Sequence, residues 1–287
     1  MKMRGQCVSC LMRRILMEIN EVDPSKEMEV MEACTVMLGQ EFRAGVVSAE
    51  CATKIHRLAY DLLGADPYIR LKRGSNEQAQ SLFPRAEEFV NDAPDAFRAA
   101  VLCSIIGNVL DYGIHKELDR PDFLLRSFES LLEEGLGVDH TARLKEHLEK
   151  AESVLYFPDN AGEIVFDQLL IREIKKLGAE ITLVAKGEPI LTDVTLEDVR
   201  DLGIDKQVDR VITTGGFAVG FPFWAMSLEL EDAIESTDLI ISKGMGNFEC
   251  FTEIEHGPIA YLMRTKCLPV AEALDAPFDK NVAMVFD

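Results

Sequence analysis

The sequence predicts an α/β protein in which an N-terminal all-α helical bundle precedes a C-terminal Rossmann-like three-layer domain with a mostly parallel sheet. Residues 1–150 carry apolar side chains at helical spacing almost throughout. Residues 151–287 instead alternate short apolar runs with amphipathic segments. Because buried parallel strands read as continuous apolar runs separated by helices, the second half indicates a sheet covered on both faces. We therefore predict a helical domain at 1–150 and an α/β domain at 151–287 that carries the functional site.

Start signals support two helices of the first half. Asp-Pro-Ser at 23–25 and Ala-Pro-Asp at 93–95 each combine a capping side chain with a proline near the first turn. No convincing strand with two-residue periodicity interrupts this half. Helices are expected at Cys7–Ile19, Ser25–Leu38, Ser48–Leu63, Asp95–Leu110, Asp119–Glu133 and Asp139–Lys150.

The second half is predicted to run through successive βα units. Gly178, directly after the first of its helices, is a typical C-cap. Strands are expected at Val154–Phe157, Ile181–Ala185, Val208–Thr213 and Leu239–Ser242, with two more at Cys267–Ala271 and Val282–Phe286. Helices are expected at Ile164–Leu177, near Leu196–Leu202, at Ser227–Ser236 and from about Asn247 to Glu255.

The charge balance limits the partners. The formal net charge is −20, from 50 Asp and Glu against 30 Lys and Arg. A surface this acidic repels nucleic-acid phosphates and anionic lipids, so we expect no binding to nucleic acid or membranes. Binding of an anionic substrate would need positive charge at the site, from either a few well-placed basic side chains or a metal ion.

We expect a cytoplasmic protein. Met1–Cys10 is polar, and Arg13, Arg14 and Glu18 interrupt the apolar residues that follow, so no signal peptide is predicted. No apolar run approaches the roughly 20 residues that span a bilayer. The seven cysteines lie mostly in apolar helical stretches of a chain too large to need disulfides, which favours reduced thiols.

Polar side chains and glycines follow four predicted strands in succession. The stretches are Asp-Asn-Ala-Gly-Glu at 159–163, Lys-Gly-Glu-Pro at 186–189 with Asp193 beyond it, Thr-Thr-Gly-Gly at 213–216, and Lys-Gly-Met-Gly-Asn at 243–247. In open α/β sheets the ligand crevice lies at the carboxyl ends of the strands. The sequence therefore predicts a ligand site at this edge of the sheet.

Asp159, Asn160 and Asp193 supply hard oxygen ligands of the kind that Mg²⁺ and Mn²⁺ prefer. The alternative is structural, because Asp and Asn also cap helices: the first two residues precede the helix near Gly162, and Asp193 precedes the helix at Leu196. Their occurrence on adjacent strand ends favours the metal interpretation.

The stretch that begins at Lys243 is a glycine-bearing turn between a buried strand and a helix. Gly244 lets the backbone approach an anion, the helix start near Asn247 points N–H groups at it, and the lysine adds charge. The alternative is a plain βα turn with a solvated lysine. Arg264 and Lys266, just before the predicted fifth strand, are either site residues or surface residues.

Two further pairs are open. Asn108 and Asp111 end an apolar helix and either reach the crevice of the second domain or only terminate the helix. Cys7 and Cys10 are either part of a second metal site or a redox pair, or two ordinary thiols near a helix start.

Together these motifs resemble the damage-control phosphatase family, once catalogued only as a domain of unknown function. The resemblance covers essentially the whole chain. Its most specific parts are Asp-Asn-Ala-Gly-Glu at 159–163 and Lys-Gly-x-Gly-Asn-x-Glu at 243–249. Pro189, Asp193 and Arg-Thr-Lys-Cys at 264–267 add to it, and the cysteine pair is similar to the stand-alone prokaryotic subfamily.

The resemblance implies a metal-dependent phosphatase that hydrolyses small phosphorylated metabolites, including sugar phosphates, that are harmful or in excess. It places the metal on Asp159, Asn160 and Asp193. It places the phosphate against Lys243, Asn247 and Lys266. To these we add four further candidates for substrate or phosphate binding: Glu163, Asn108, Asp111 and Gly244. Met245 stands where eukaryotic relatives carry an aspartate that contacts substrate, so their sugar-phosphate specificity does not transfer to this chain.

We therefore predict a phosphomonoester hydrolase that uses a divalent metal (Mg²⁺, Mn²⁺, Co²⁺ or Ni²⁺), with Asp159, Asn160, Asp193 and Lys243 as catalytic residues. Water or the carboxylate of Asp159 would attack phosphorus. The partner is a small-molecule phosphate ester, and the sequence does not fix the oligomeric state. The alternatives are an S-adenosylmethionine-dependent carboxyl methyltransferase, which would want a glycine-rich turn after the first strand, and a non-catalytic metal- or nucleotide-binding protein.

Overall fold

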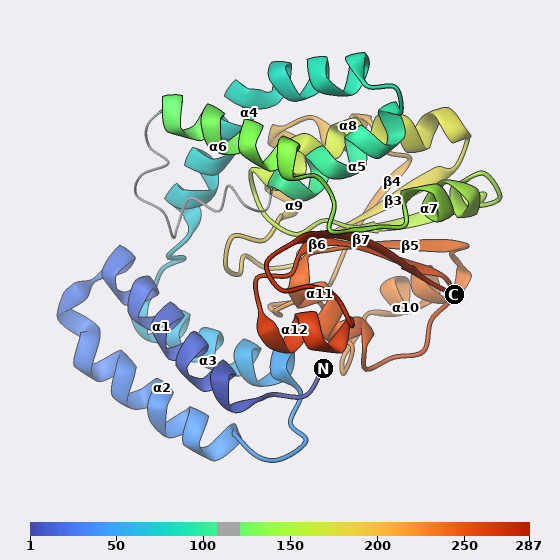
Figure 1. The fold of residues 1–287 in the computed structure, drawn as a ribbon. Helices are drawn as coiled ribbons and strands as arrows, with labels where there is room; N and C mark the ends of the chain where they lie inside the picture. The colour runs from blue at the N-terminus through green and yellow to red at the C-terminus, as the bar shows by residue number, and fades with distance from the viewer. Residues whose placement is uncertain (108–120) are drawn as a thin grey trace.

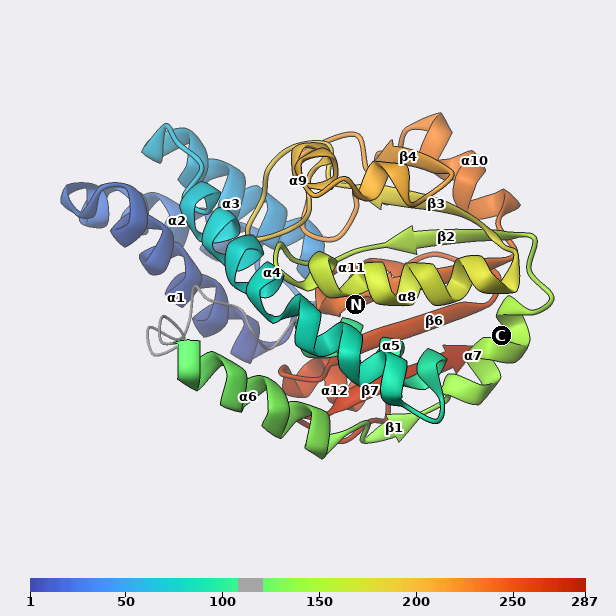
Figure 2. The same cartoon turned by 90° about the horizontal axis from the view of Figure 1, so that it is seen from above.

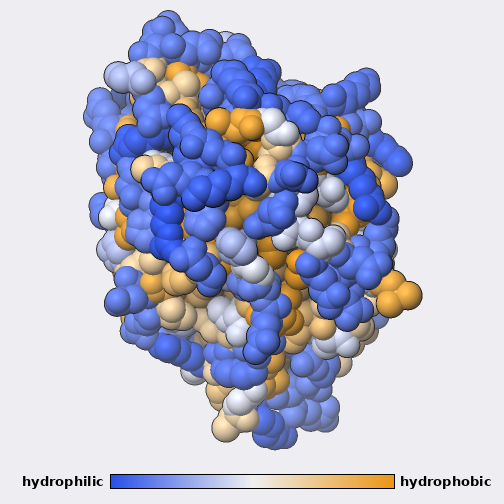
Figure 3. Space-filling view, turned by 90° about the vertical axis from the view of Figure 1, so that its right-hand side faces the viewer, coloured by the Kyte–Doolittle hydropathy of each residue, from blue (hydrophilic) through white to orange (hydrophobic). Residues whose placement is uncertain are grey.

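A computed structural model of the chain describes residues 1–107 and 121–287. A group of helices is followed by a seven-stranded sheet with helices on both faces (Figure 1). This architecture confirms the predicted fold class. Within the described ranges, no helix is long and apolar enough to cross a membrane. The face on the right-hand side of Figure 1 is mostly hydrophilic, with smaller apolar areas between the polar side chains (Figure 3).

The first three helices have an apolar core of their own, which includes Ile15, Cys34 and Ile55. They lie beyond the carboxyl ends of the parallel strands (Figure 2). Their start is close to the predicted one for each helix. They are α1 (Gly5–Val22), α2 (Glu27–Glu41) and α3 (Ser48–Leu63).

The next four helices cover one face of the sheet and its edge. Phe97 and Ile105 of one and Leu144 of another share a buried cluster with strand residues such as Val154. The division of the chain at residue 150 stays a prediction, and this cluster groups the helices before it with the sheet. The helices are α4 (Ile69–Asp92), α5 (Ala96–Ile106), α6 (Pro121–Glu134) and α7 (Thr141–Leu148).

Helix α4 is absent from the elements that the sequence predicts. It contains Pro84, which normally ends a helix, and Lys72 and Ser75 lie on its buried side near its start. Polar residues on the buried side remove the apolar periodicity by which a helix is recognised. They are buried because this end of α4 packs against polar loops at the end of the sheet, as described below.

The sheet has the order β1-β7-β6-β5-β2-β3-β4, and every neighbouring pair is parallel except β6 with β7. Its strands are β1 (Val138–Asp139), β2 (Ser153–Phe157), β3 (Glu180–Ala185), β4 (Arg210–Thr213), β5 (Leu239–Lys243), β6 (Ile259–Arg264) and β7 (Asn281–Phe286). The helices of this half are α8 (Glu163–Leu177), α9 (Leu196–Asp201), α10 (Leu228–Ser236), α11 (Gly244–Phe251) and α12 (Leu268–Ala273). Figure 1 shows α8 on one face and α10, α11 and α12 on the other.

One predicted strand is wrong. The segment Cys267–Ala271 is the start of helix α12, with Pro269 in its first turn, where a proline is well tolerated. The fifth buried strand is Ile259–Arg264, immediately before it. Arg264 and Lys266 therefore follow a strand rather than precede one. Because β6 is parallel to β5, these two residues lie at the same edge of the sheet as the end of β5.

The order of the strands places a topological switch point between β2 and β5. After β2 the chain adds β3 and β4 on one side, and it then returns to add β5 on the other side of β2. The connections that leave the carboxyl ends of β2 and β5 consequently run in opposite directions, and ligands of open α/β sheets bind at such a switch point. The segments there begin at Asp159 and Gly244.

Candidate active site

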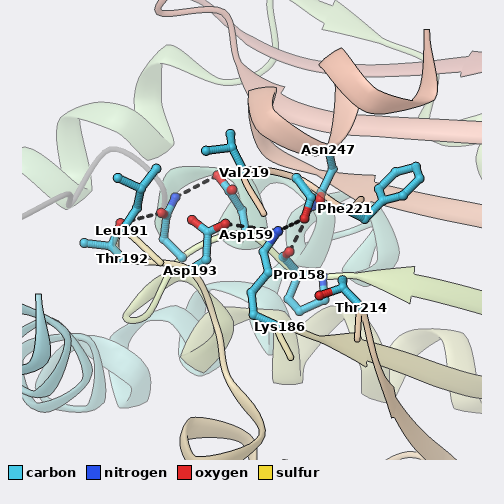
Figure 4. Close-up of polar contacts among 12 residues, drawn as sticks. Pro158, Asp159, Lys186, Leu191, Thr192, Asp193, Thr214, Val219, Phe221 and Asn247 are labelled. Carbon is cyan, nitrogen blue, oxygen red and sulfur yellow. Dashed lines mark hydrogen bonds and ion pairs between the residues drawn. The ribbon is translucent and has the colours of Figure 1, made fainter. Parts of the chain in front are cut away.

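The structure brings Asp159, Asn160 and Asp193 together at the end of β2. The backbone N–H of Val194 donates to the carbonyl of Asp159 at 2.9 Å, and that of Ala161 donates to the carbonyl of the residue before Asp193 at 2.7 Å. Asn160 and Asp193 form an isolated antiparallel bridge. The segments that follow two neighbouring strands are thus joined through their backbones, which brings the three residues together. Figure 4 shows the side chains of Asp159 and Asp193 close to each other.

None of the three side chains caps the helix that follows it, α8 or α9. The alternative interpretation of these residues as helix caps is therefore wrong. Helix α8 begins after Gly162, without a hydrogen bond from a capping side chain. Helix α9 is capped by Thr195, whose hydroxyl accepts from the N–H of Asp198. The side chains of Asp159 and Asp193 therefore do not cap α8 or α9.

The carboxamide of Asn160 is oriented by its neighbours. Its Nδ2 donates to Oδ2 of Asp159 at 2.7 Å and lies 3.4 Å from Oε2 of Glu163. Its Oδ1 accepts from the hydroxyl of Thr192 at 2.6 Å. A carbonyl oxygen has two lone pairs. One lone pair of Oδ1 thus stays available for a ligand.

Helix α4 holds the loop between β2 and α8. The N–H of Gly162 donates to Oδ1 of Asn76 at 2.7 Å. Gly162 has a φ of +79°, and a Cβ there would lie 3.1 Å from the carbonyl oxygen of Ser75. The polar face of α4 therefore packs against the loop that carries the candidate ligands.

Helix α11 begins directly against Asp159. A Cβ added to Gly244 would lie 2.0 Å from Cγ of Asp159, and Gly244 has a φ of +73°. The carboxamide of Asn247 is buried and donates to the carbonyls of Pro158 at 3.0 Å and Lys243 at 2.9 Å. These bonds fix the first turn of α11 to the end of β2. The roles of Gly244 and Asn247 in binding phosphate stay predictions.

Gly244→Ala tests this close approach. The new Cβ would overlap the carboxylate of Asp159, so we expect that group to move and phosphatase kcat/KM to fall by about 10²-fold, as misplaced catalytic groups typically cause. Gly64→Ala is the matched control, because its φ of +72° brings the same backbone strain while no heavy atom lies within 4 Å. A Gly244→Ala enzyme as active as Gly64→Ala would contradict the expected collision.

Electrostatics make this site one that favours a cation. Burial, Glu163 and Asp193 raise the pKa of Asp159 well above its usual value, and Lys186 and Lys243 only partly oppose them. Neighbouring carboxylates repel one another, and the two lysines only partly offset this repulsion at Asp159. A divalent cation between them would relieve that repulsion.

The donor set fits a hard divalent metal. Within the part of the chain that the structure describes, no group of three His, Cys, Asp or Glu side chains is arranged to hold a metal. The candidate set has two carboxylates and one amide, Asp159, Asp193 and Asn160. Mg²⁺ and similar ions are often held by one or two carboxylates, with water and substrate oxygens completing the shell.

The side chain of Lys243 lies in a buried polar network, and its role as a catalytic residue stays a prediction. Its side chain is completely buried, and Nζ donates to Oε1 of Glu163 at 2.5 Å, Oδ1 of Asp167 at 2.7 Å and the carbonyl of Ser104 at 3.0 Å. Burial lowers the pKa of this ammonium, but the two carboxylates outweigh it and raise the pKa above its usual value. Lys243 is a permanently charged member of a buried network between α5, α8 and β5.

The remaining predicted residues are spread more widely. Lys266 lies half-buried just after β6, at the site edge of the sheet, and Arg264 pairs with Asp279 at 2.7 Å. Cys7 is half-buried and Cys10 exposed, and both are free thiols. Their proposed metal or redox role stays a prediction. Asn108 and Asp111 lie outside the described residues.

One charged residue at the centre of the site was given no role from the sequence. Lys186, at the end of β3, is only 4% exposed, and its Nζ lies 3.1 Å from Oδ2 of Asp193 (Figure 4). It also donates to the carbonyl of Gly220. Its position directly after a buried strand, seven residues before Asp193, was the available signal.

Comparisons with known proteins show the family of the chain. The model of the family described as damage-control phosphatase ARMT1-like domain matches residues 3–282. The chain is 37% identical over 294 residues to a damage-control phosphatase of Archaeoglobus fulgidus, with 100% of both chains covered. It is 33% identical over 288 residues to one of Pyrococcus horikoshii, covering 99% of this chain and 98% of that protein. A crystal structure of a DUF89 family protein from Pyrococcus horikoshii matches with a TM-score of 0.89 at 32% identity, covering 99% of each chain. The chain therefore belongs to the damage-control phosphatase family with the ARMT1-like domain.

Proposed function

We propose that this chain is a divalent-metal-dependent phosphatase that hydrolyses small phosphorylated metabolites, such as sugar phosphates. The observation that carries the proposal is the meeting of Asp159, Asn160 and Asp193 at the switch point between β2 and β5. Two relatives of similar length are named damage-control phosphatases, which supports the reaction class.

Asp159, Asn160 and Asp193 would hold the metal, and a bound divalent cation would withdraw charge from the phosphoryl group as a Lewis acid. The chain itself supplies the orientation of these groups. Thr192 and Asp159 fix the carboxamide of Asn160, and the first turn of α11 fixes Asp159 from the other side. Asp159 would act either as the nucleophile or as the group that accepts a proton from attacking water.

Removal of metal tests the proposal directly. Protein stripped with EDTA and dialysed is expected to release no phosphate from para-nitrophenyl phosphate. Addition of Mg²⁺, Mn²⁺, Co²⁺ or Ni²⁺ should restore the activity, with one or two ions clearly preferred. A phosphate-release screen over a few dozen phosphometabolites then identifies the substrate class. Hydrolysis that ignores EDTA, or no release from any ester with any ion, contradicts the proposal.

A further inference from the structure

The proposed reaction needs a cationic group that binds the phosphoryl oxygens, and every N–H donor of Lys243 already has an acceptor within the protein. An ammonium has three N–H donors. All three of Lys243 are used by Glu163, Asp167 and the carbonyl of Ser104. Any contact with a substrate would break a bond inside a completely buried network. A lysine that contacts the phosphoryl group at this edge is therefore a residue other than Lys243.

Lys186 is oriented differently. Its backbone N–H donates to the carbonyl of Val194 at 2.8 Å, which fixes its Cα beside the segment that carries Asp193. Within the described residues its Nζ has two partners, Oδ2 of Asp193 and the carbonyl of Gly220. One of its three N–H donors is left over. Figure 4 shows the ammonium between Asp193, Asp159 and the loop that contains Val219 and Phe221.

The acceptor at Gly220 is itself rigidly held. A Cβ at this residue would lie 2.4 Å from the carbonyl oxygen of Gly246 and 2.5 Å from Sγ of Cys250, so the loop is pressed against α11. The N–H of Val219 donates to the hydroxyl of Thr53 on α3 at 3.0 Å. The carbonyl is thus fixed from two sides before any ligand binds. The ammonium of Lys186, which donates to this fixed carbonyl, therefore needs no reorganisation as negative charge develops on a ligand.

We propose that Lys186 is the catalytic cation of this site, whose remaining N–H contacts a non-bridging oxygen of the transferred phosphoryl group. Asp193 has two oxygens, and Lys186 uses Oδ2, which leaves Oδ1 for the metal. Asp193 would therefore link the metal and the ammonium, so that both positive charges face the same phosphoryl group. The inference rests on the proposed phosphatase function and adds the identity of its phosphate-binding group.

Lys186→Met tests the assignment in the full-length protein. With Mn²⁺ saturating, we expect kcat/KM for para-nitrophenyl phosphate to fall by about 10²-fold, the usual cost of one preorganised donor. The inhibition constant of inorganic phosphate should rise at least about tenfold. Mn²⁺ affinity, measured by electron paramagnetic resonance, should be unchanged or tighter, because a positive charge beside Asp193 has been removed. Lys175→Met is the control for charge, since Lys175 pairs with Asp209 at the surface.

The Mn²⁺ measurement separates this role from a merely structural one. If Lys186 only positioned Asp193, Mn²⁺ affinity would fall together with activity, and that result overturns the proposal. So does an unchanged phosphate inhibition constant. If Lys186→Met lacks the wild-type circular dichroism spectrum, Lys186→Gln replaces it in the test. Glutamine keeps N–H donors for Asp193 and Gly220 but removes the positive charge, and we expect the same losses of kcat/KM and of phosphate affinity. Failure of the phosphatase function itself is distinct, because wild-type protein would then be inactive with every metal.

Discussion

Asp193→Ala is expected to lower kcat/KM for para-nitrophenyl phosphate by at least about 10³-fold at the metal concentration that saturates the wild type. The change removes a candidate metal ligand and leaves Lys186 without the carboxylate 3.1 Å from its ammonium. Loss of a group that acts with others as one unit costs nearly the whole of their joint effect. Steady-state kinetics and Mn²⁺ binding together measure the result, and Mn²⁺ affinity should fall in parallel with activity.

The matched control is Asp205→Ala. Asp205 is exposed in the short helical turn between α9 and β4, so its loss makes the same change in net charge far from the ligands. We expect this variant to keep wild-type kinetics. Asp193→Ala should also be less stable than the wild type, because it leaves the buried ammonium of Lys186 without its carboxylate partner, so its circular dichroism spectrum at the assay temperature must match that of the wild type. Metal-dependent activity within tenfold of the wild type in Asp193→Ala would refute the proposed ligand set.

Much of the candidate site can be predicted from the sequence because strand ends are easy to recognise. Asp159 and Asp193 each follow a buried apolar run, and parallel strands end at one edge, so their proximity follows from the alternation of strands and helices. The structure adds that the two segments are joined by backbone hydrogen bonds, such as the one from Val194 to the carbonyl of Asp159. Such bonds between segments distant in the sequence have no signal in either segment alone.

The two lysines show what was missed and why. Side chains alternate between the faces of a strand. In β5, Ile241 and Lys243 point to the face covered by α5 and α8, so the lysine is directed into the core. In β3, Val184 points to the opposite face, and Lys186, the residue directly after the strand, continues this alternation and reaches the carbonyl of Gly220. The glycine pattern after Lys243 does not indicate to which face of the sheet its side chain points, whereas the two-residue alternation distinguishes the two lysines.

Helix α4 and strand β6 were missed for a different reason. Both lack the usual local signals, since α4 contains Pro84 and buries Lys72, while the six-residue strand Ile259–Arg264 lies directly before a second apolar run. Which of two adjacent apolar runs forms the strand is decided by pairing with β5 and β7 across the sheet. Periodicity within one segment cannot report that choice.

Lys243→Met is expected to destabilise the protein by about 3–5 kcal/mol, the usual effect of removing one partner from a buried ion pair. Lys243, Glu163 and Asp167 are all completely buried, so the variant leaves two carboxylates facing each other without a cation. Urea denaturation measures the loss. Lys175→Met, which breaks an exposed pair with Asp209, should cost less than about 1 kcal/mol.

The pH dependence and a compensated variant show whether unpaired charge is the cause. Burial raises the pKa of Asp167 to about 6, with Lys243 opposing and Glu163 adding to the rise. This folded-state pKa exceeds the pKa of the same group in the unfolded chain. The contribution of Asp167 to the free energy of unfolding therefore falls as the pH rises from the unfolded-state pKa to the folded-state pKa. Removing Lys243 moves the upper limit of this pH interval higher, so the destabilisation should be larger near pH 8 than near pH 5.5. Adding Glu163→Gln and Asp167→Asn to Lys243→Met removes the charges and should recover most of the loss. A loss that is independent of pH and survives these two changes would mean that the packing of the lysine stem, rather than its charge, holds α8 to the sheet.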